Sequence, residues 1–261
     1  MNLSFSKYHG TGNDFILIDG TTLTEPIDES LRMHLCHRYF GIGADGVIVV
    51  SPSEVSDVDY IMEYYNSDGG LGSMCGNGAR CAFHFAQSLG LAGSNANFAA
   101  YDGIHTAEEL VDGQFSVTMQ DVDTVQSRAD DVYILDTGSP HYVHFVSMID
   151  AVDVRREGHD IRFSPEFIEK GINVNFAQID DDAIKVRTYE RGVENLTMSC
   201  GTGVTAVVLA FASKKGLRKG PVRILTDGGK LAVDFVYSAG KFTSIKLVGP
   251  VVRVFDGTFK I

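Results

Sequence analysis

Two cysteines stand in nearly the same sequence context, each at the start of a glycine-rich turn. Cys75 begins the segment CGNGARC, and Cys200 begins the segment CGTGVTA. In both, Cys-Gly-x-Gly leads into a run of small and apolar residues that predicts a helix. A cysteine just before a helix start meets backbone N–H groups and the positive end of the helix dipole, and both stabilise a thiolate over a thiol. The sequence therefore predicts two activated thiols.

Two such thiols suit a reaction at a carbon that carries an acidic proton. A thiolate removes a proton from one face of the carbon while a thiol delivers one to the other face, which inverts the stereocentre. The N–H groups of the two helix starts can hold a carboxylate on that carbon and stabilise the charge that builds up on it. A cysteine hydrolase is the alternative, but it needs one nucleophilic thiol with a nearby histidine and leaves the second cysteine without a task.

The flanks of the two cysteines repeat as well. A strand containing tyrosine, a polar loop, Cys-Gly-x-Gly, an apolar helix and Gly-Leu follow in that order in residues 61–91 and again in 184–217. We interpret the chain as two halves derived from one ancestral unit. The expected domains are residues 1–118, rejoined by a C-terminal strand at 250–261, and residues 119–249.

Most of the chain has the pattern of short strands, rich in Val, Ile, Phe and Tyr and separated by Gly, Asp, Asn and Ser. The expected strands are 15–18, 46–50, 60–65, 115–119, 132–135, 142–146, 174–179, 184–189, 222–225, 231–236 and 251–255. Helices are expected at 28–40, 78–91 and 203–217, and the last two are apolar on nearly every side, as helices inside a core are. The predicted class is α+β, with two pseudo-repeat domains. Each is a strand-rich, mixed or antiparallel sheet wrapped around a buried central helix.

Composition narrows the class of protein. The 261 residues are 44% hydrophobic and 21% charged, with a net charge of -12, which argues against non-specific nucleic-acid binding. No apolar run approaches the roughly 18 residues of a membrane span, and the N-terminus lacks the pattern of a signal peptide, so we expect a cytoplasmic protein. The cysteines have no CxxC spacing, so we expect no metal site. Cys36 and Cys81 are predicted to be buried apolar side chains.

Seven ordered blocks give the chain a resemblance to the diaminopimelate epimerase family over almost its whole length. They are HGTGNDFILID, GIGADGVIVV, NSDGGLGSMCGNGARC, GSPHYV, INVNFAQ, YERGVENLTMSCGTG and VGPVVRVFDG. The resemblance implies a cofactor-free isomerase that interconverts LL- and meso-2,6-diaminopimelate in lysine and peptidoglycan precursor synthesis. It also implies a homodimer. A pyridoxal cofactor would need a Schiff-base lysine, and no lysine lies in these blocks.

The resemblance implies roles for individual residues. Cys75 and Cys200 would be the acid and the base, and His141 and Glu190 would assist them. The implied substrate contacts are Asn13, Asn66, Gly76, Asn77, Ser139, Asn173, Glu190, Arg191, Gly201 and Thr202. The two residues after each cysteine would act through their backbone on the reacting carboxylate. The amide, guanidinium and carboxylate side chains suit a substrate with two ammonium and two carboxylate groups.

The chain departs from the common family pattern at a few positions. Ser139 replaces an asparagine, Gly46 replaces a glutamine, and Leu196-Thr197 stands where Glu-Thr is usual. These changes affect substrate recognition more than the type of reaction. His9 and Arg80 lie near the motifs, but the sequence assigns them no role.

Three other functions are consistent with parts of the pattern. Proline racemases and hydroxyproline epimerases also use two cysteines, but on a ring substrate with one carboxylate. A non-catalytic amino-acid-binding module explains two lobes but not paired thiols. A disulfide between Cys75 and Cys200 is a vulnerability to oxidation in our interpretation, not a function. Which cysteine rests as the thiolate stays open, because the two contexts are alike.

Overall fold

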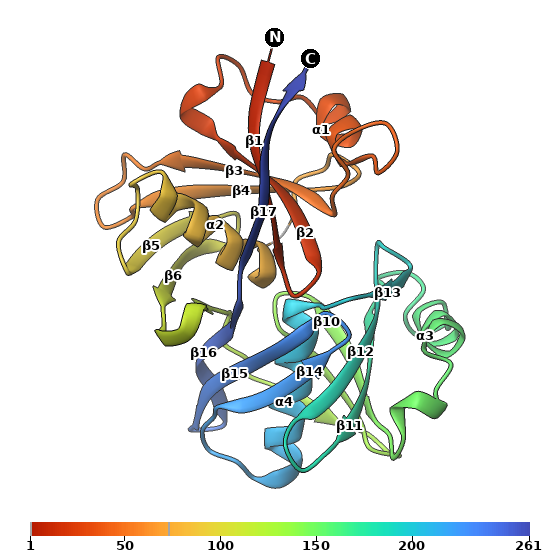
Figure 1. The fold of residues 1–261 in the computed structure, drawn as a ribbon. Coiled ribbons are helices and arrows are strands. Elements are labelled where there is room, and N and C mark those ends of the chain that lie inside the picture. The colour runs from red at the N-terminus through yellow and green to blue at the C-terminus, as the bar shows by residue number, and fades with distance from the viewer. Residues whose placement is uncertain (1, 73) are drawn as a thin grey trace. The chain divides into compact units, whose positions relative to one another are not determined.

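The computed structural model describes residues 2–72 and 74–261. They divide into two compact units, one comprising the chain up to Val117 together with Gly249–Ile261, and the other comprising Thr118–Val248. Each unit is rich in strands and packs one long helix on its sheet, namely α2 (Gly76–Ser88) in the first and α4 (Gly201–Lys215) in the second (Figure 1). The predicted α+β class is confirmed.

The strands of the first unit pair in the order β17, β1, β2, β3, β4, β5, β6, β7. Their bounds are β1 Asn2–Gly10, β2 Asn13–Asp19, β3 Gly46–Pro52, β4 Tyr60–Asn66, β5 Asn95–Ala100, β6 Gly103–Glu109, β7 Gln114–Thr118 and β17 Val252–Lys260. The pairs β2–β3 and β4–β5 are parallel, and the remaining pairs in this order are antiparallel. The sheet is therefore mixed.

The strands of the second unit pair in the order β8, β9, β10, β11, β12, β14, β15, β16, and the short β13 adds to β12. Their bounds are β8 Val125–Ser127, β9 Val132–Asp136, β10 Pro140–Phe145, β11 Asn173–Ile179, β12 Ile184–Glu190, β13 Asn195–Thr197, β14 Val222–Thr226, β15 Gly229–Ser238 and β16 Lys241–Pro250. Here β10–β11 and β12–β14 are parallel, and the remaining pairs are antiparallel. The pattern of the first unit is thus repeated strand by strand.

The helices occupy equivalent places in the two units. A short helix connects the first parallel pair, α1 (Glu29–Cys36) between β2 and β3 and α3 (Val154–Arg162) between β10 and β11. The long helix precedes the last strand of the second parallel pair, α2 before β5 and α4 before β14. Short 3-10 turns lie at Gly20–Thr22, Val111–Gly113 and Ile149–Ala151. The internal repeat inferred from the cysteine flanks therefore extends to the topology.

The long helices form for the reasons that the sequence indicates. Both bury most of their residues, which fits their apolar composition. The Gly-Leu pair after each helix ends it in the same way, because the backbone N–H of the leucine donates to a carbonyl five residues earlier. Leu91 N donates to Ala86 O at 2.9 Å, and Leu217 N donates to Ala212 O at 2.9 Å.

The first helix is shorter than the predicted range 28–40. Asp28 caps α1 by accepting a hydrogen bond from Leu31 N, but the helix ends at Cys36. The following loop folds back, and the N–H groups of Ile42 and Gly43 both donate to Leu35 O. The last carbonyls of the helix are therefore satisfied by the loop instead of by another helical turn.

Helix α3 was not predicted from the sequence. Its apolar side is narrow, consisting of Val154, Gly158 and the partly buried Ile161, and its other residues are charged or histidine, so the segment does not stand out in the sequence. Gly158 lies directly on the sheet, because a Cβ atom there would approach Tyr189 Cβ to 2.5 Å. Close packing on β12 and the Asp153 cap hold this polar helix in place.

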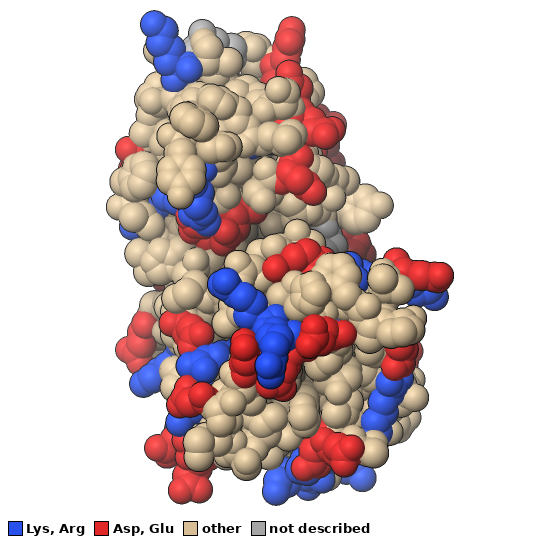
Figure 2. All heavy atoms as spheres, turned by 90° about the vertical axis from the view of Figure 1, so that its right-hand side faces the viewer, with Lys and Arg blue, Asp and Glu red and all other residues tan. Residues whose placement is uncertain are grey.

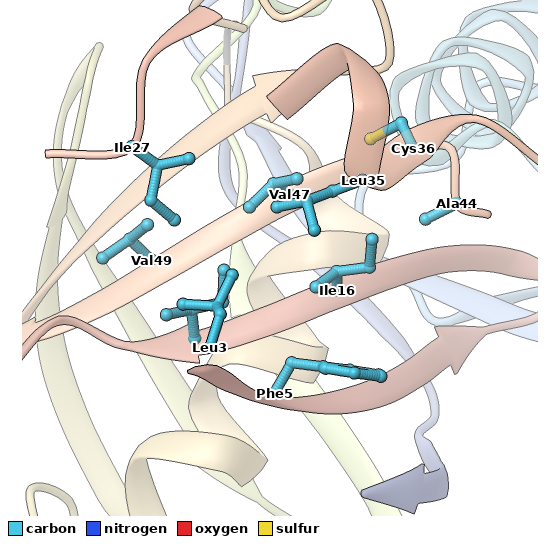
Figure 3. Packing of buried hydrophobic residues seen from close by; sticks show 10 residues of the cluster. Leu3, Phe5, Ile16, Ile27, Leu35, Cys36, Ala44, Val47 and Val49 are labelled. Carbon is cyan, nitrogen blue, oxygen red and sulfur yellow. The ribbon is translucent and has the colours of Figure 1, made fainter. Parts of the chain in front are cut away.

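The core of the first unit lies on both faces of its sheet. Figure 3 shows one face, where apolar side chains from β1, β2 and β3 pack together with the end of α1. Cys36 belongs to this cluster, and burial raises the pKa of its thiol to about 12. Cys81 is fully buried in α2. Both cysteines are therefore apolar core residues, as predicted.

Charged side chains of both signs are mixed on the surface. In the face drawn in Figure 2, Lys and Arg side chains lie beside Asp and Glu side chains. Among the ion pairs of the second unit, Arg187 binds Asp150 at 3.0 Å and Asp227 at 3.3 Å. The acidic surplus of the chain is thus spread among basic groups on that face.

Candidate active site

The two cysteines of the repeated motif occupy equivalent backbone positions. Cys75 is the N-cap residue of α2 with φ −109° and ψ 112°, and Cys200 is the N-cap residue of α4 with φ −118° and ψ 113°. Neither side chain caps its helix by a hydrogen bond, and neither helix has an acidic residue in its first turn. Each thiol therefore lies at the positive end of a helix dipole that no carboxylate of the first turn offsets.

The second glycine of each motif is required by packing. A Cβ atom on Gly78 would lie 3.0 Å from Ile48 Cδ1, and one on Gly203 would lie 2.5 Å from Asn175 Oδ1 and 3.3 Å from Cys200 Sγ. These glycines let the helix start approach its own sheet. The sheet contact explains why Gly recurs there.

Asn13 connects Cys75 to a polar network in the first unit. Its Oδ1 accepts hydrogen bonds from the Cys75 thiol at 3.6 Å and from Asn77 Nδ2 at 3.2 Å. Its Nδ2 donates to Asp45 Oδ2 at 2.8 Å. Asn13 is the first residue of β2, directly after the turn at Thr11-Gly12, where both residues have positive φ. The HGTGND block thus forms a tight turn that presents Asn13 to the start of α2.

An ion-pair cluster behind Asn13 was not foreseen from the sequence. Asp14 accepts from Lys7 at 2.7 Å and from Arg38 at 2.8 Å, and Arg38 also binds Asp45 at 2.6 Å. Burial opposes ionisation of Asp14, but the hydrogen bonds from Arg38 and Lys7 lower its pKa to about 2. Burial raises the pKa of Asp45, and the charge of Asp14 acts in the same direction. The cluster fixes the loop that carries Asp45 against the start of β2.

Asn66 lies at the same edge of the sheet as Asn13. It ends β4, where it pairs with Gly46 at the start of β3. A Cβ atom on Gly72 would lie 3.3 Å from Asn66 Nδ2 and 2.5 Å from the Tyr64 ring. A Cβ atom on Gly46 would lie 2.5 Å from the same ring. Tyr64 therefore fills the space beside Gly46, the position where glutamine is common in the resembling family.

Cys200 lies beside a hydroxyl group in the second unit. Its Sγ is 3.5 Å from Thr202 Oγ1, and Thr137 Oγ1 donates to Thr202 O at 3.0 Å. Asn175 approaches the same helix start next to Gly203. Cys200 itself is only 7% exposed. Its thiol is thus more enclosed than Cys75, which is half-buried.

His141 is part of a buried network beside Cys200. Asn175 Nδ2 lies 3.1 Å from His141 Nδ1 and also donates to Tyr142 O, while Thr188 Oγ1 donates to Asn175 Oδ1. Burial, reinforced by the charge of Arg191, lowers the pKa of His141 to about 3, so the imidazole is neutral at pH 7. Because Nδ1 accepts from the Asn175 amide, the ring proton belongs on Nε2, which has no hydrogen-bond partner among the described residues. Asn175 was missed from the sequence, although the INVN segment contains it.

Ser139, Asn173 and Arg191 form a separate group in the second unit. Asn173 Nδ2 and Arg191 Nη2 both donate to Ser139 Oγ, at 2.8 and 3.3 Å, and Arg191 N donates to Asn173 Oδ1 at 2.9 Å. Arg191 Nη1 also donates to Lys170 O at 3.0 Å. Glu190 ends β12 next to this group. The guanidinium is thus positioned before any ligand binds.

The structure gathers the predicted residues into one set per unit. The first set is Asn13, Asn66, Cys75, Gly76 and Asn77, and the second is Ser139, His141, Asn173, Glu190, Arg191, Cys200, Gly201 and Thr202. Hydrogen bonds join Asn13, Cys75 and Asn77, and Asn66 lies at the same edge of the sheet, at the end of β4. In the described part of the chain, no three His, Cys, Asp or Glu side chains are arranged to hold a metal ion.

The described helices include none that is long and apolar enough to cross a membrane.

Comparison with known proteins identifies the family. The family model for diaminopimelate epimerase matches residues 5–125 and 133–254. A diaminopimelate epimerase from Flavobacterium psychrophilum is 42% identical over 254 residues, which cover 97% of this chain and 98% of that protein. One from Aquifex aeolicus is 37% identical, with 98% and 97% covered.

A solved structure of a hydroxyproline epimerase from Agrobacterium vitis has a TM-score of 0.70 at 15% identity and covers 98% of this chain and 92% of its own, which shows a shared fold. The match of the family model over both units and the full-length identity decide the assignment: this chain belongs to the diaminopimelate epimerase family.

Proposed function

We propose that this chain interconverts LL- and meso-2,6-diaminopimelate, with Cys75 and Cys200 acting from opposite faces of one α-carbon. The observation that carries the proposal is the equivalence of the two cysteines, each the N-cap residue of the buried helix in its unit. Family membership supports the choice of substrate.

The proposed step transfers two protons. The thiolate of one cysteine forms an S–H bond with the α-proton, and the electrons of the broken C–H bond move into the adjoining carboxylate group. The S–H bond of the other cysteine breaks, and its proton bonds to the α-carbon from the opposite face. The two cysteines have then exchanged protonation states, and proton exchange with water restores them. The balance needs no cofactor, and we expect none.

The carboxylate on the reacting carbon is the group that needs stabilisation, because it takes up the charge of the enolate-like intermediate. The backbone N–H groups at Gly76-Asn77 and Gly201-Thr202 are in the first turns of α2 and α4, where helix N–H groups have no partner within the helix. We propose that they bind this carboxylate. Asn13 and His141 would hold the surroundings of the two thiols in place.

The inert end of the substrate has its own ammonium and carboxylate groups. Ser139, Asn173 and Arg191 are already joined by hydrogen bonds, and Arg191 is suited to clamp a carboxylate with two N–H groups. Glu190 lies beside them and can accept from an ammonium group. Asn66 supplies a further amide in the first unit. A proline-like ring substrate with one carboxylate has no use for such a group, which favours diaminopimelate.

The remaining parts of the proposal rest on the family alone. They are a role in lysine and peptidoglycan precursor synthesis, a cytoplasmic location and a homodimer.

Exchange of the α-proton tests the function directly. The reduced protein is incubated with LL-diaminopimelate in D2O, and the α-proton signal is followed by NMR for the wild type, Cys75→Ala and Cys200→Ala. The proposal expects deuterium entry together with the meso isomer, and a loss of about 10²–10⁴-fold or more in each single variant. Exchange only with proline or hydroxyproline would overturn the substrate. Normal ligand binding in both variants with no exchange on any of these substrates would favour a binding module.

A further inference from the structure

A fully buried arginine lies beside Cys75. Arg80, in the second turn of α2, is 0% exposed. Its guanidinium donates to Asn77 Oδ1 at 2.9 Å and to Gly76 O at 3.4 Å, which are both neutral acceptors. Asn77 in turn donates to Asn13 Oδ1, the same atom that accepts from the Cys75 thiol. Arg80 is therefore linked to Cys75 through two side chains.

Arg80 carries its charge at neutral pH. Burial lowers its pKa to about 10, so the guanidinium remains protonated at pH 7. Among the described residues, the ionisable groups that act on it are the thiols of Cys81 and Cys75. A buried cation without an anion nearby is costly, and a nearby anion removes much of that cost. Burial raises the pKa of Cys81 to about 12, so Cys81 stays a thiol and Cys75 is left as the source of negative charge.

The side chains of the sheet that pack against α2 supply no negative charge to balance the Arg80 guanidinium. Tyr8, Phe15 and Ile48 pack against the helix and are uncharged, since burial raises the pKa of Tyr8. His84, on α2 itself, binds Tyr8, and burial lowers its pKa.

Two further carboxylates near α2 have other partners. Asp45 binds Asn13 and Arg38, and Glu109 of β6 accepts a hydrogen bond from Gln87.

The equivalent position in the second unit has no charge. Arg80 follows Cys75 by the same number of residues as Thr205 follows Cys200. Thr205 is also fully buried, and its Oγ1 donates to Gly201 O at 2.9 Å, the counterpart of the bond from Arg80 to Gly76 O. The charged side chains of the site there, Glu190 and Arg191, are of opposite sign, and His141 is neutral.

We propose that Arg80 is a positioning residue that holds Cys75 as the thiolate in the resting enzyme, while Cys200 rests as the thiol. Its catalytic meaning rests on the proposed two-cysteine function. One contact opposes it, because the hydrogen bond from the Cys75 thiol to Asn13 favours the protonated form. An S–H group is a weak donor, whereas a full charge in a dry interior acts much more strongly, so the cation dominates. A stereoisomer whose α-proton faces Cys75 can then react without a prior proton transfer, because Cys75 is already the base and Cys200 the acid.

Alkylation against pH tests the proposal without any substrate. The full-length reduced protein is treated with iodoacetamide between pH 5 and 10, and the labelling of Cys75 and Cys200 is followed separately by peptide mass spectrometry. The midpoints of the pH profiles of the two cysteines are compared. Absolute labelling rates are not compared, because they also depend on how easily iodoacetamide reaches each thiol. Variants are Arg80→Met, Arg80→Lys, which keeps the charge, and Thr205→Val as the matched change in the second unit.

The proposal expects the Cys75 midpoint at least one pH unit below that of Cys200 in the wild type. Arg80→Met should raise the Cys75 midpoint by one unit or more, Arg80→Lys should restore most of the difference, and Thr205→Val should leave Cys75 unchanged. Equal midpoints in the wild type would overturn the proposal even if Arg80→Met does not fold. An unchanged Cys75 profile in folded Arg80→Met would also overturn it. A low Cys75 midpoint in a protein that does not epimerise diaminopimelate would support Arg80 and refute the proposed function.

Discussion

The two units share their strand pairing and their helix starts but surround the candidate thiol with different chemistry. Around Cys75 the side chains belong to a charged network, with Asp45 and Arg38 behind Asn13 and Arg80 buried below the helix start. Around Cys200 the network consists of His141, Asn175 and Thr188, and all three are neutral and buried. Backbone geometry is thus common to both units, whereas charge is not.

This difference has a direct meaning for a reversible proton transfer. An acid and a base of the same residue type must differ in protonation at the start of each turnover, and equivalent backbone positions cannot produce that difference. Side chains that fill the same place in the two helices, Arg80 and Thr205, can. Under the proposed function, the duplicated scaffold positions the two thiols and buried side chains distinguish their protonation states.

Acidification should separate the two units most strongly. The pKa of His141 is lowered to about 3 by burial, so between about pH 6.5 and 3 the unfolded chain binds a proton that the folded second unit does not. Stability of the second unit should therefore fall by a few kcal/mol as pH falls through that range. The pKa of Asp14 is lowered to about 2, so its contribution to the first unit is lost only below about pH 4.

Hydrogen exchange measured by mass spectrometry can follow both units in one sample. Peptides of the second unit should lose protection first as the pH is lowered, after correction for intrinsic exchange rates. His141→Gln removes the titrating group and should abolish the decline between pH 6.5 and 4. Earlier loss of protection in the first unit would contradict the assigned charge states.

Loss of one asparagine in each unit should have unequal effects on stability. Asn175→Ala leaves His141 Nδ1, Thr188 Oγ1 and Tyr142 O without their buried partner, so we expect a loss of about 2–4 kcal/mol in the free energy of unfolding. Asn13→Ala removes bonds at a half-buried position and should cost about 1 kcal/mol. Urea unfolding of both variants measures the difference. Equal losses would show that the second network is not the more buried one.

The second glycine of the two motifs gives a smaller contrast. In Gly203→Ala the new methyl group meets Oδ1 of the Asn175 side chain. Three hydrogen bonds hold this side chain in place, so we expect a loss of about 1–3 kcal/mol in the free energy of unfolding. In Gly78→Ala it meets the flexible end of Ile48, and the gain in helix propensity of up to about 1 kcal/mol should offset the contact. Thermal unfolding of the two variants compares them. A larger loss in Gly78→Ala would contradict the packing described for the helix starts.

Most of the helices and strands can be predicted from the sequence, for reasons that can be named. The helices α2 and α4 are apolar on nearly every side and end at Gly-Leu, so pattern alone predicts them within two or three residues at either end. Most of the strands rich in Val, Ile and Tyr were predicted for the same reason. Strands β1, β5, β6, β8, β13 and β16 were not predicted. In β5 and β6 the reason is the low strand propensity of Asn, Ala and Glu, which pair here through tertiary context.

The contents of the site were harder to predict than its location. The two cysteines can be recognised from the sequence because their flanking segments repeat. Lys7 and Asp14 lie on the two strands of the β1–β2 hairpin, and Arg38 follows Asp14 by 24 residues, so no local pattern connects all three. Arg80 looked like an ordinary helix residue until its complete burial became visible. The spacing of residues in the sequence predicts helix starts and turns. Networks of charged side chains cannot be predicted in this way, because they depend on which side chains the fold brings together.

The smallest expected effect concerns which residues bind the inert end of the substrate and which act at its reacting end. Asn13 contacts Cys75, whereas Ser139 contacts Arg191 and Asn173 and has no hydrogen bond to a cysteine among the described residues. Under the proposed function, Ser139→Ala should weaken binding of the inert end equally in the ground and transition states. We therefore expect KM for diaminopimelate to rise about fivefold, with kcat changed less than about twofold.

Asn13→Ala, assayed beside it, should instead lower kcat, because it alters the surroundings of a reacting thiol. Ser139→Thr keeps the hydroxyl and should stay near the wild-type KM. A fall in kcat for Ser139→Ala with KM unchanged would mean that the Ser139 group acts on the reacting carbon. The second unit would then combine acid–base and anchoring roles around Cys200. The contrast between the charged network at Cys75 and the neutral network at Cys200 would then no longer describe how the two units divide the reaction.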